Sequence, residues 1–218
     1  SNIYLRNFNF MLGARYEHYD FSRYLKHNIP DNYQEYALED GSYESYYFKG
    51  VMDTRDNSYF ATDGMFFEVD GTVWHTNFKD GFENFGSVRL MVQGALGVGE
   101  SFAIIPHFYG RIIMGNCTEI PFLNYIGGSE PGRYFRQQLP FIGINYANPA
   151  YNSVMIGRVD LRQRLGSNHY IYGMVNYMRD AGSLDKVFSE HGRGIWGAGV
   201  KYSLNTPVGP VSVNVHWS

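Results

Sequence analysis

Charged and apolar side chains alternate in one segment of this 218-residue sequence, and the charged ones are the first candidates for chemistry. Arg158, Asp160 and Arg162 occupy every second position, with Val159 and Leu161 between them. Residues two apart on a β-strand point to the same side, so this segment would have one charged and one apolar face. A soluble core could not accept the charged face, whereas a water-filled barrel lumen could.

Glu68 and Asp70 are also two positions apart, next to apolar Phe67 and Val69. Paired carboxylates catalyse glycoside hydrolysis, but nothing distinguishes this pair from any other polar strand face. The charged residues could line an ion or substrate path, or they could stabilise the sheet through pairs of opposite charge on neighbouring strands. We interpret the following residues as a structural lumen wall: Glu68, Asp70, Arg158, Asp160 and Arg162.

Residue types that bind metals or act as nucleophiles are scattered. The seven histidines show no H-x-H or H-E-x-x-H spacing, and the single cysteine, Cys117, can form neither an intrachain disulfide nor a thiolate metal cluster. The sequence therefore predicts no catalytic residue, no metal and no cofactor in these residues.

The composition is typical of a membrane barrel. Aromatic residues make up 17% of the chain, yet the mean hydropathy is -0.33. This balance is expected when alternate strand residues face lipid and a watery lumen, and aromatic girdles mark both interfaces. A formal net charge of -3 argues against nucleic acid as a partner, and the lack of an apolar run of about 18 residues argues against a transmembrane helix.

Nine segments, most of which alternate with a period of two, are predicted to be strands. They cover residues 7–17, 43–52, 64–75, 88–96, 102–115, 155–164, 169–177, 196–203 and 211–217. A tilted strand needs about ten residues to cross a bilayer, and the longer segments meet that length. Phe8 and Val159 mark the expected lipid face, but the two faces of residues 169–177 cannot be assigned from the sequence.

The connections between these segments alternate in length. Short turns are predicted near Arg55, Val98, Ser167 and Pro207, and longer connections near Asp31, Lys79, Ser129 and Leu184. Residues 53–57 are predicted to be a tight polar turn and residues 116–149 the longest loop. Short turns at one end and long loops at the other are typical of outer-membrane barrels.

Nine is an odd number of strands, and bacterial single-chain barrels close with an even number. An open edge in hydrocarbon would leave backbone groups unpaired, which is costly. We therefore expect residues 1–218, as one domain, to be part of a larger antiparallel transmembrane β-barrel, with strands before Ser1 and at least one after Ser218. The chain starts without a signal peptide, which fits such a segment or a cleaved leader.

Several short motifs resemble the BamA/TamA-type superfamily of sixteen-stranded outer-membrane barrels. They are the sequences DTRDN at residues 53–57, DG at 63–64, GGS at 127–129, RYF at 133–135, DAG at 180–182 and TPVGP at 206–210. The resemblance implies that the nine strands are the seventh to the fifteenth of sixteen. It also implies a long loop that folds into the lumen, where an arginine contacts an aspartate of the wall.

The residues of this chain that match the lumen-loop anchor of the family are Arg133, Asp180, Gly127, Gly128 and Gly132. One position departs from the pattern, because Tyr134 follows Arg133 where the family usually has Gly. The resemblance therefore assigns the anchor to Arg133 and Asp180.

Two longer stretches resemble the carboxy-terminal barrels of patatin-like phospholipases from Bacteroidetes-type bacteria. They are GRYFRQQLPFIGIN at residues 132–145 and LRQRLGSNHY at 161–170. In those proteins a lipase domain with a G-x-S-x-G serine precedes the barrel. That motif is absent here, and the sequence GSEPG at residues 128–132 lacks its spacing.

The resemblance implies a barrel in the outer membrane of a Gram-negative bacterium that anchors, or helps to translocate, an attached phospholipase domain. The expected partners are outer-membrane lipids and an upstream domain of the same protein. An assembly or translocation factor of the BamA/TamA type is an alternative, and it would have periplasmic repeat domains upstream. A soluble β-barrel or sandwich that binds a ligand is a further alternative.

Overall fold

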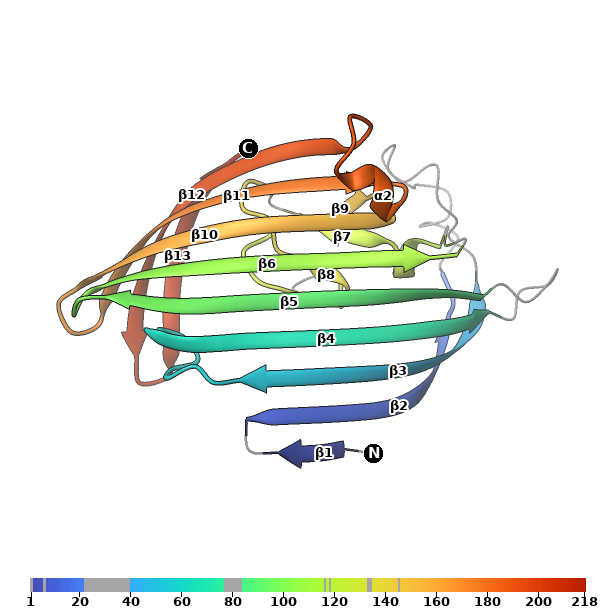
Figure 1. The fold of residues 1–218 in the computed structure, drawn as a ribbon, viewed down its shortest axis with the longest axis horizontal. Coiled ribbons are helices and arrows are strands. Elements are labelled where there is room, and N and C mark those ends of the chain that lie inside the picture. The colour runs from blue at the N-terminus through green and yellow to red at the C-terminus, as the bar shows by residue number, and fades with distance from the viewer. Residues whose placement is uncertain are drawn as a thin grey trace.

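The computed structural model of the chain describes residues 2–5, 7–21, 40–76, 84–115, 117, 119–132, 135–144 and 146–218. Ten strands form one curved antiparallel sheet in the order β1-β2-β3-β4-β5-β6-β10-β11-β12-β13 (Figure 1). The strands are β1 (Asn2–Leu5), β2 (Phe8–Tyr19), β3 (Gly41–Asp53), β4 (Asp63–Thr76), β5 (Asn84–Val98), β6 (Phe102–Met114), β10 (Ser153–Leu165), β11 (His169–Ala181), β12 (Arg193–Thr206) and β13 (Gly209–Trp217).

The predicted fold class, an incomplete antiparallel transmembrane-type β-barrel, is confirmed. All nine predicted strands are present, and those from β2 to β6 and from β10 to β12 contain 12 to 15 residues. The short strand β1, which pairs with β2, was not predicted because four residues are too few to show a period. Helix α2 (Leu184–Val187) is a single turn, and no helix among the described residues is long and apolar enough to cross a membrane.

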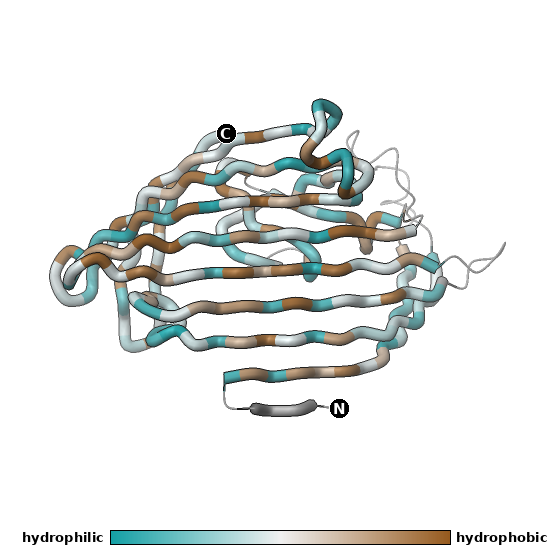
Figure 2. Tube along the Cα trace, in the orientation of Figure 1, coloured by the Kyte–Doolittle hydropathy of each residue, from teal (hydrophilic) through white to brown (hydrophobic). Residues whose placement is uncertain are grey.

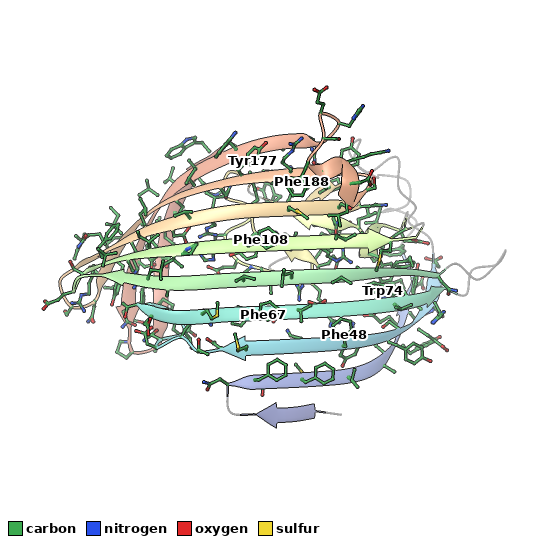
Figure 3. The ribbon with its side chains drawn as sticks, in the orientation of Figure 1. Phe48, Phe67, Trp74, Phe108, Tyr177 and Phe188 are labelled. Carbon is green, nitrogen blue, oxygen red and sulfur yellow. The ribbon has the colours of Figure 1, made fainter. Side chains whose placement is uncertain are left out.

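The alternation of side chains gives the sheet an apolar outer face and a more polar inner face. On β10, Val159 is 38% exposed, whereas the neighbouring Arg158 is 4% exposed. Phe48 and Phe108 lie on the outer face of β3 and β6 (Figure 3). Large exposed apolar side chains occur on every strand from β2 to β6 and from β10 to β13, and Figure 2 shows the alternation along the strands.

The connection between β3 and β4 covers residues 54–62 and is longer than the tight turn predicted at residues 53–57. Oδ1 of Asp56 accepts hydrogen bonds from the backbone N–H groups of Thr62 (2.8 Å) and Asp63 (3.2 Å). Oδ1 of Asn57 accepts one from the N–H of Tyr59 (2.8 Å). Such side-chain acceptors stabilise a compact loop. Asp56 and Asn57, two of the polar residues that indicated a turn in the sequence, therefore supply the acceptors of this loop.

Pro106 lies in β6, which pairs with β5 on one side and β10 on the other. A proline in a sheet normally implies an edge strand or a bulge, but β6 is a central strand and its register contains no extra residue at this position. The β5–β6 pairing stops at Gln93↔His107 and resumes in the same register at Leu96↔Ile104. A proline is accommodated in a central strand here because the ladder is interrupted opposite it, at Gly94.

The connection between β6 and β10, residues 115–152, is called the lumen loop below. It contains the 3-10 helix η2 (Ile120–Phe122) and a small sheet in which β7 (Asn124–Ile126) lies between β8 (Gln138–Leu139) and β9 (Asn148–Ala150). This small sheet lies on the concave side of the large sheet (Figure 1). The long loop predicted from the sequence therefore has secondary structure of its own. Its Gly and Pro content indicated irregular structure, so these short elements were not predicted.

The outer face can be tested with Val159→Arg, since Val159 is the central residue of β10 and pairs with Val175 and Pro106. An arginine near the bilayer midplane should lower the free energy of unfolding in lipid vesicles by about 2–4 kcal/mol. The matched control is Val208→Arg, in the β12–β13 turn, where the side chain is 95% exposed. Urea unfolding of the full-length protein measures both, and equal stability of the two variants would contradict the face assignment.

Candidate functional site in the lumen

The lumen loop packs on the inner face of the large sheet through an apolar core. Ile126 and Phe141 of the loop form one buried cluster with Ile156 of β10 and Met178 of β11. All four side chains are at most 1% exposed. The expectation that inward side chains face water is therefore wrong in this zone, because the loop displaces water from an apolar part of the wall.

Arg111 of β6 supplies the hydrogen bonds that the loop backbone needs where η2 leads into β7. Its Nη1 donates to the carbonyl oxygens of Phe122 and Leu123, both at 3.2 Å, and to Oδ1 of Asn124 at 2.7 Å. Its Nη2 donates to Oγ of Ser87 at 3.2 Å. Arg111 is 3% exposed, and its guanidinium offers five donors in one plane, so a single wall residue satisfies several buried acceptors.

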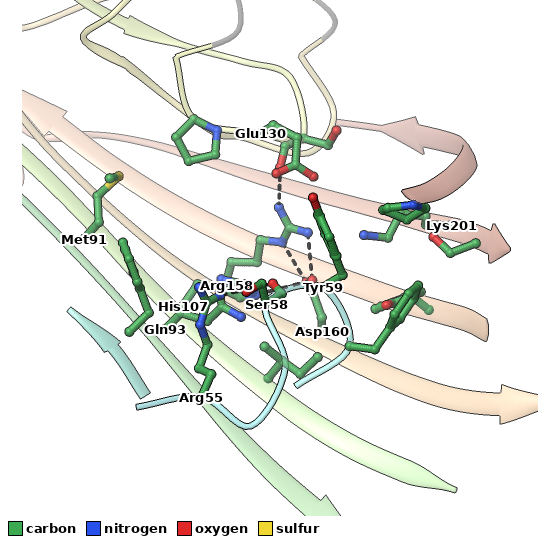
Figure 4. Close-up of a pocket in the computed structure, with 18 of the residues that line it drawn as sticks. Arg55, Ser58, Tyr59, Met91, Gln93, His107, Glu130, Arg158, Asp160 and Lys201 are labelled. Atoms are coloured by element: carbon green, nitrogen blue, oxygen red, sulfur yellow. Dashed lines mark hydrogen bonds and ion pairs between the residues drawn. The ribbon is translucent and has the colours of Figure 1, made fainter. Parts of the chain in front are cut away.

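Arg158 and Asp160, two of the predicted wall residues, pair directly and hold the tip of the loop. Nε and Nη2 of Arg158 donate to the two carboxylate oxygens of Asp160 at 2.6 and 2.7 Å, and Nη1 donates to the carbonyl oxygen of Ser129 at 3.1 Å. Nε2 of His107 lies 3.3 Å from Oδ2 of Asp160. Figure 4 shows this group beside a cavity. The fork–fork geometry makes the pair a strong one.

Asp180 is fully buried at the end of β11 and binds both a neighbouring strand and the loop. Arg193 of β12 donates to Oδ1 from Nε (2.9 Å) and to Oδ2 from Nη2 (2.6 Å). The backbone N–H of Tyr151 also donates to Oδ2, at 3.1 Å. The predicted partner Arg133 lies outside the described residues, so its contact with Asp180 stays a prediction.

Asn176 of β11 pairs with the loop backbone as a neighbouring strand would. Its Oδ1 accepts from the N–H of Ile142 at 2.6 Å, and its Nδ2 donates to the carbonyl oxygen of Ile142 at 3.2 Å. Beside it, β12 has glycine at two inward positions. A Cβ on Gly197 would lie 1.8 Å from the Ile142 oxygen, and one on Gly199 would lie 2.9 Å from Ile142 Cγ2. The loop therefore packs directly on the backbone of β12, at positions where glycines leave the wall without side chains.

The three predicted loop glycines all have positive φ, at 135° for Gly127, 71° for Gly128 and 66° for Gly132. Gly127 could not carry a side chain, because its Cβ would lie 1.9 Å from the carbonyl oxygen of Tyr146. The carbonyl oxygen of Gly127 accepts a hydrogen bond from Nε2 of the buried Gln138 at 2.6 Å. These glycines shape the turn between β7 and the tip of the loop.

Glu68 and Asp70 on β4 are joined by an arginine that the sequence analysis did not select. Nη2 of Arg89 on β5 is 2.8 Å from Oε1 of Glu68, and its Nε is 2.6 Å from Oδ2 of Asp70. Nζ of Lys49 on β3 is 2.7 Å from Oε2 of Glu68. Nη1 of Arg89 also donates to the carbonyl oxygen of Arg136 at 3.1 Å. This cross-strand network therefore touches the lumen loop as well.

A second segment, residues 54–62, enters the lumen at the end where the turns are short. The ring of Phe60 stacks on Tyr170 of β11 with centroids 4.0 Å apart, and both share a buried cluster with Ile142 of the lumen loop. Nη2 of Arg162, another predicted wall residue, donates to the carbonyl oxygen of Ala61 at 2.7 Å. A cavity of about 230 Å³ lies between this segment and the tip of the lumen loop (Figure 4).

The structure thus brings together two groups of predicted residues. Arg158 pairs with Asp160, and Glu68 meets Asp70 through Arg89, while Asp180 has a separate place at the long-loop end. The wall residues Arg111 and Asn176 were missed because a strand pattern shows that a residue points inward but not what it meets. The described residues contain no group of His, Cys, Asp and Glu suited to a metal ion.

A curved antiparallel sheet with an apolar outer face, a polar inner face and an inserted loop defines the class of transmembrane β-barrel proteins. The sequence profile of the OMP85 superfamily matches residues 1–218, and the chain belongs to that superfamily. It is an outer-membrane β-barrel of the OMP85 type, which confirms the resemblance to BamA/TamA-type barrels at the level of the superfamily.

A crystal structure of BamA from Haemophilus ducreyi lacking POTRA domains 1–3 has a similar fold, with a TM-score of 0.64 and 15% sequence identity. The match covers 96% of this chain and 47% of that one, so this chain spans about half the length of that structure. No curated protein sequence matches the chain.

Arg111→Met keeps the apolar stem of Arg111 but leaves the carbonyl groups of Phe122 and Leu123 without donors. We expect the free energy of unfolding to fall by about 1.5–3 kcal/mol, the value for hydrogen bonds to charged groups. The exposed Arg164, whose Nη2 donates to the carbonyl oxygen of Glu100, provides the control Arg164→Met. Urea unfolding of both variants measures the difference.

Cys117 provides a second readout for Arg111→Met. Burial raises the pKa of this loop thiol to about 12, so it is neutral and unreactive at pH 8, because only the thiolate is alkylated. Loosening of the loop by Arg111→Met should speed its reaction with iodoacetamide, measured by mass spectrometry. An unchanged rate together with unchanged stability would show that Arg111 does not hold the loop.

Gly197→Ala tests the docking of Ile142 on β12, since the new Cβ would overlap the Ile142 carbonyl group. Overpacking of this kind typically costs about 1–3 kcal/mol. Gly173→Ala is the matched control, because a Cβ there meets nothing within 4 Å. A lower melting temperature for Gly197→Ala alone is expected, and equal melting of the two variants would mean that the loop does not rest on this part of the wall.

Proposed function

We propose that this barrel resides in the bacterial outer membrane and anchors an attached domain of the same protein there. The observation that carries the proposal is the continuous apolar outer face, to which nine strands contribute large exposed side chains. A patch of that extent on a soluble protein would drive association, whereas in a bilayer it matches the hydrocarbon. Outer-membrane lipids are therefore the partner that this face fits.

The interior supports an anchor better than an open pore. The lumen loop and residues 54–62 both lie inside the barrel, and their side chains meet in one buried cluster that contains Phe60 and Ile142. A cavity of about 230 Å³ lies beside them. Translocation of an attached domain through this lumen would require both segments to leave it.

We further propose that the attached domain is a patatin-like phospholipase. Support comes from the two sequence stretches that resemble such proteins, residues 132–145 and 161–170. In the fold these stretches come together, because Ile142 from the first and Tyr170 from the second lie in the same buried cluster. The barrel itself would contribute binding and placement to that enzyme, not catalysis.

The full-length protein tests both parts of this proposal. It should stay in the outer-membrane fraction after washing with sodium carbonate at pH 11, and it should hydrolyse phospholipid through a fluorophosphonate-reactive serine outside these 218 residues. Extraction by carbonate would contradict the membrane assignment and favour a soluble binding module. A membrane-resident product without a reactive serine, but with repeat domains upstream, would replace the phospholipase with an assembly or translocation factor.

A further inference from the structure

A second cavity, of about 80 Å³, lies in the half of the lumen nearer the long loops, between β2, β4, β5, β6 and the lumen loop. Four arginines line it, Arg15, Arg89, Arg111 and Arg136, but only two carboxylates, those of Glu17 and Asp70. The lining therefore carries two more positive than negative charges, and a buried charge is costly without a partner of opposite charge.

Two of these guanidinium groups lack a carboxylate partner among the described residues. Arg111 is buried and donates to carbonyl, amide and hydroxyl oxygens, all of them neutral. Arg136 is exposed and lines the cavity, and its guanidinium lies over the ring of Tyr47, 5.9 Å from the centroid. Arg89, in contrast, is fully paired with Glu68 and Asp70.

An unpaired donor lines the same cavity. Trp74 is 8% exposed, and its buried Nε1–H has no hydrogen-bond partner among the described residues. Its ring is held in place by stacking on Phe85, with centroids 5.1 Å apart. Buried N–H groups are rarely left without an acceptor. The unpaired indole N–H therefore indicates that a bound group supplies acceptor atoms in the cavity.

From this excess of donors and positive charge we infer that the cavity binds a small oxyanion of the phosphate type. A phosphate monoester carries about −1.5 to −2 charges at pH 7 and has three strong acceptor oxygens, which matches both the charge excess and the unpaired donors. One water needs roughly 10–15 Å³ of such a cavity, so its volume suits a tetrahedral oxyanion. The inference does not depend on the identity of any attached domain.

The test is calorimetric titration of inorganic phosphate into the full-length protein in detergent, with chloride at the same ionic strength as the reference. We expect one phosphate to bind per chain. Arg136→Gln, which keeps the backbone carbonyl that Arg89 uses, should weaken binding at least tenfold. Trp74→Phe, which keeps the stacked ring but removes the N–H, should weaken it severalfold. The control Arg164→Gln, at the end of β10 next to the short β10–β11 turn and outside the cavity lining, should bind like the unmodified protein.

A second titration distinguishes the source of the phosphate group. Micelles doped with a short-chain phosphatidic acid should compete with inorganic phosphate if lipid headgroups can enter the cavity, and should not compete if it admits only the free ion; either result is consistent with an oxyanion site. Absence of binding to the unmodified protein would overturn the inference. So would equal affinity of Arg136→Gln and Arg164→Gln, provided that both variants show the heat-modifiable gel mobility of a folded barrel.

Discussion

The interior of this barrel depends on one requirement, which is that the backbone of the inserted loop must find hydrogen-bond partners away from bulk water. An unpaired buried carbonyl or N–H group costs about as much free energy as a lost hydrogen bond. Wall side chains provide these partners. Arg111 donates hydrogen bonds to the turn after η2, Asn176 accepts one from the N–H of Ile142, and Asp180 accepts one from the backbone near the end of the loop. The loop is therefore held at several separate places along the wall.

The same requirement explains why the inner face is not uniformly polar. Where the loop covers the wall, apolar side chains such as Ile156 and Met178 form a dry core, and burial of that surface favours docking. Where the loop leaves space, charged networks around Arg89 and Arg158 line two cavities. The two inward glycines of β12, Gly197 and Gly199, let Ile142 of the loop approach the sheet closely.

Two inserted segments from opposite ends of the barrel meet inside it. Phe60 comes from the end with short turns, and Ile142 comes from the lumen loop, yet both belong to one buried cluster. This interior supports the proposed role of the barrel as a membrane anchor.

The sequence by itself determined the nine predicted strands, the outward apolar faces of most of them and the charged inner positions such as Arg158 and Asp160. It could do so because a strand has a fixed period of two and because lipid and lumen impose opposite chemistry on alternate residues. It could not show that Arg111 would meet a loop turn, that Asn176 would pair with Ile142, or that Phe60 would cross the lumen. Those contacts join residues far apart in the chain, and only the curvature of the sheet and the path of the loop decide which inward side chains meet.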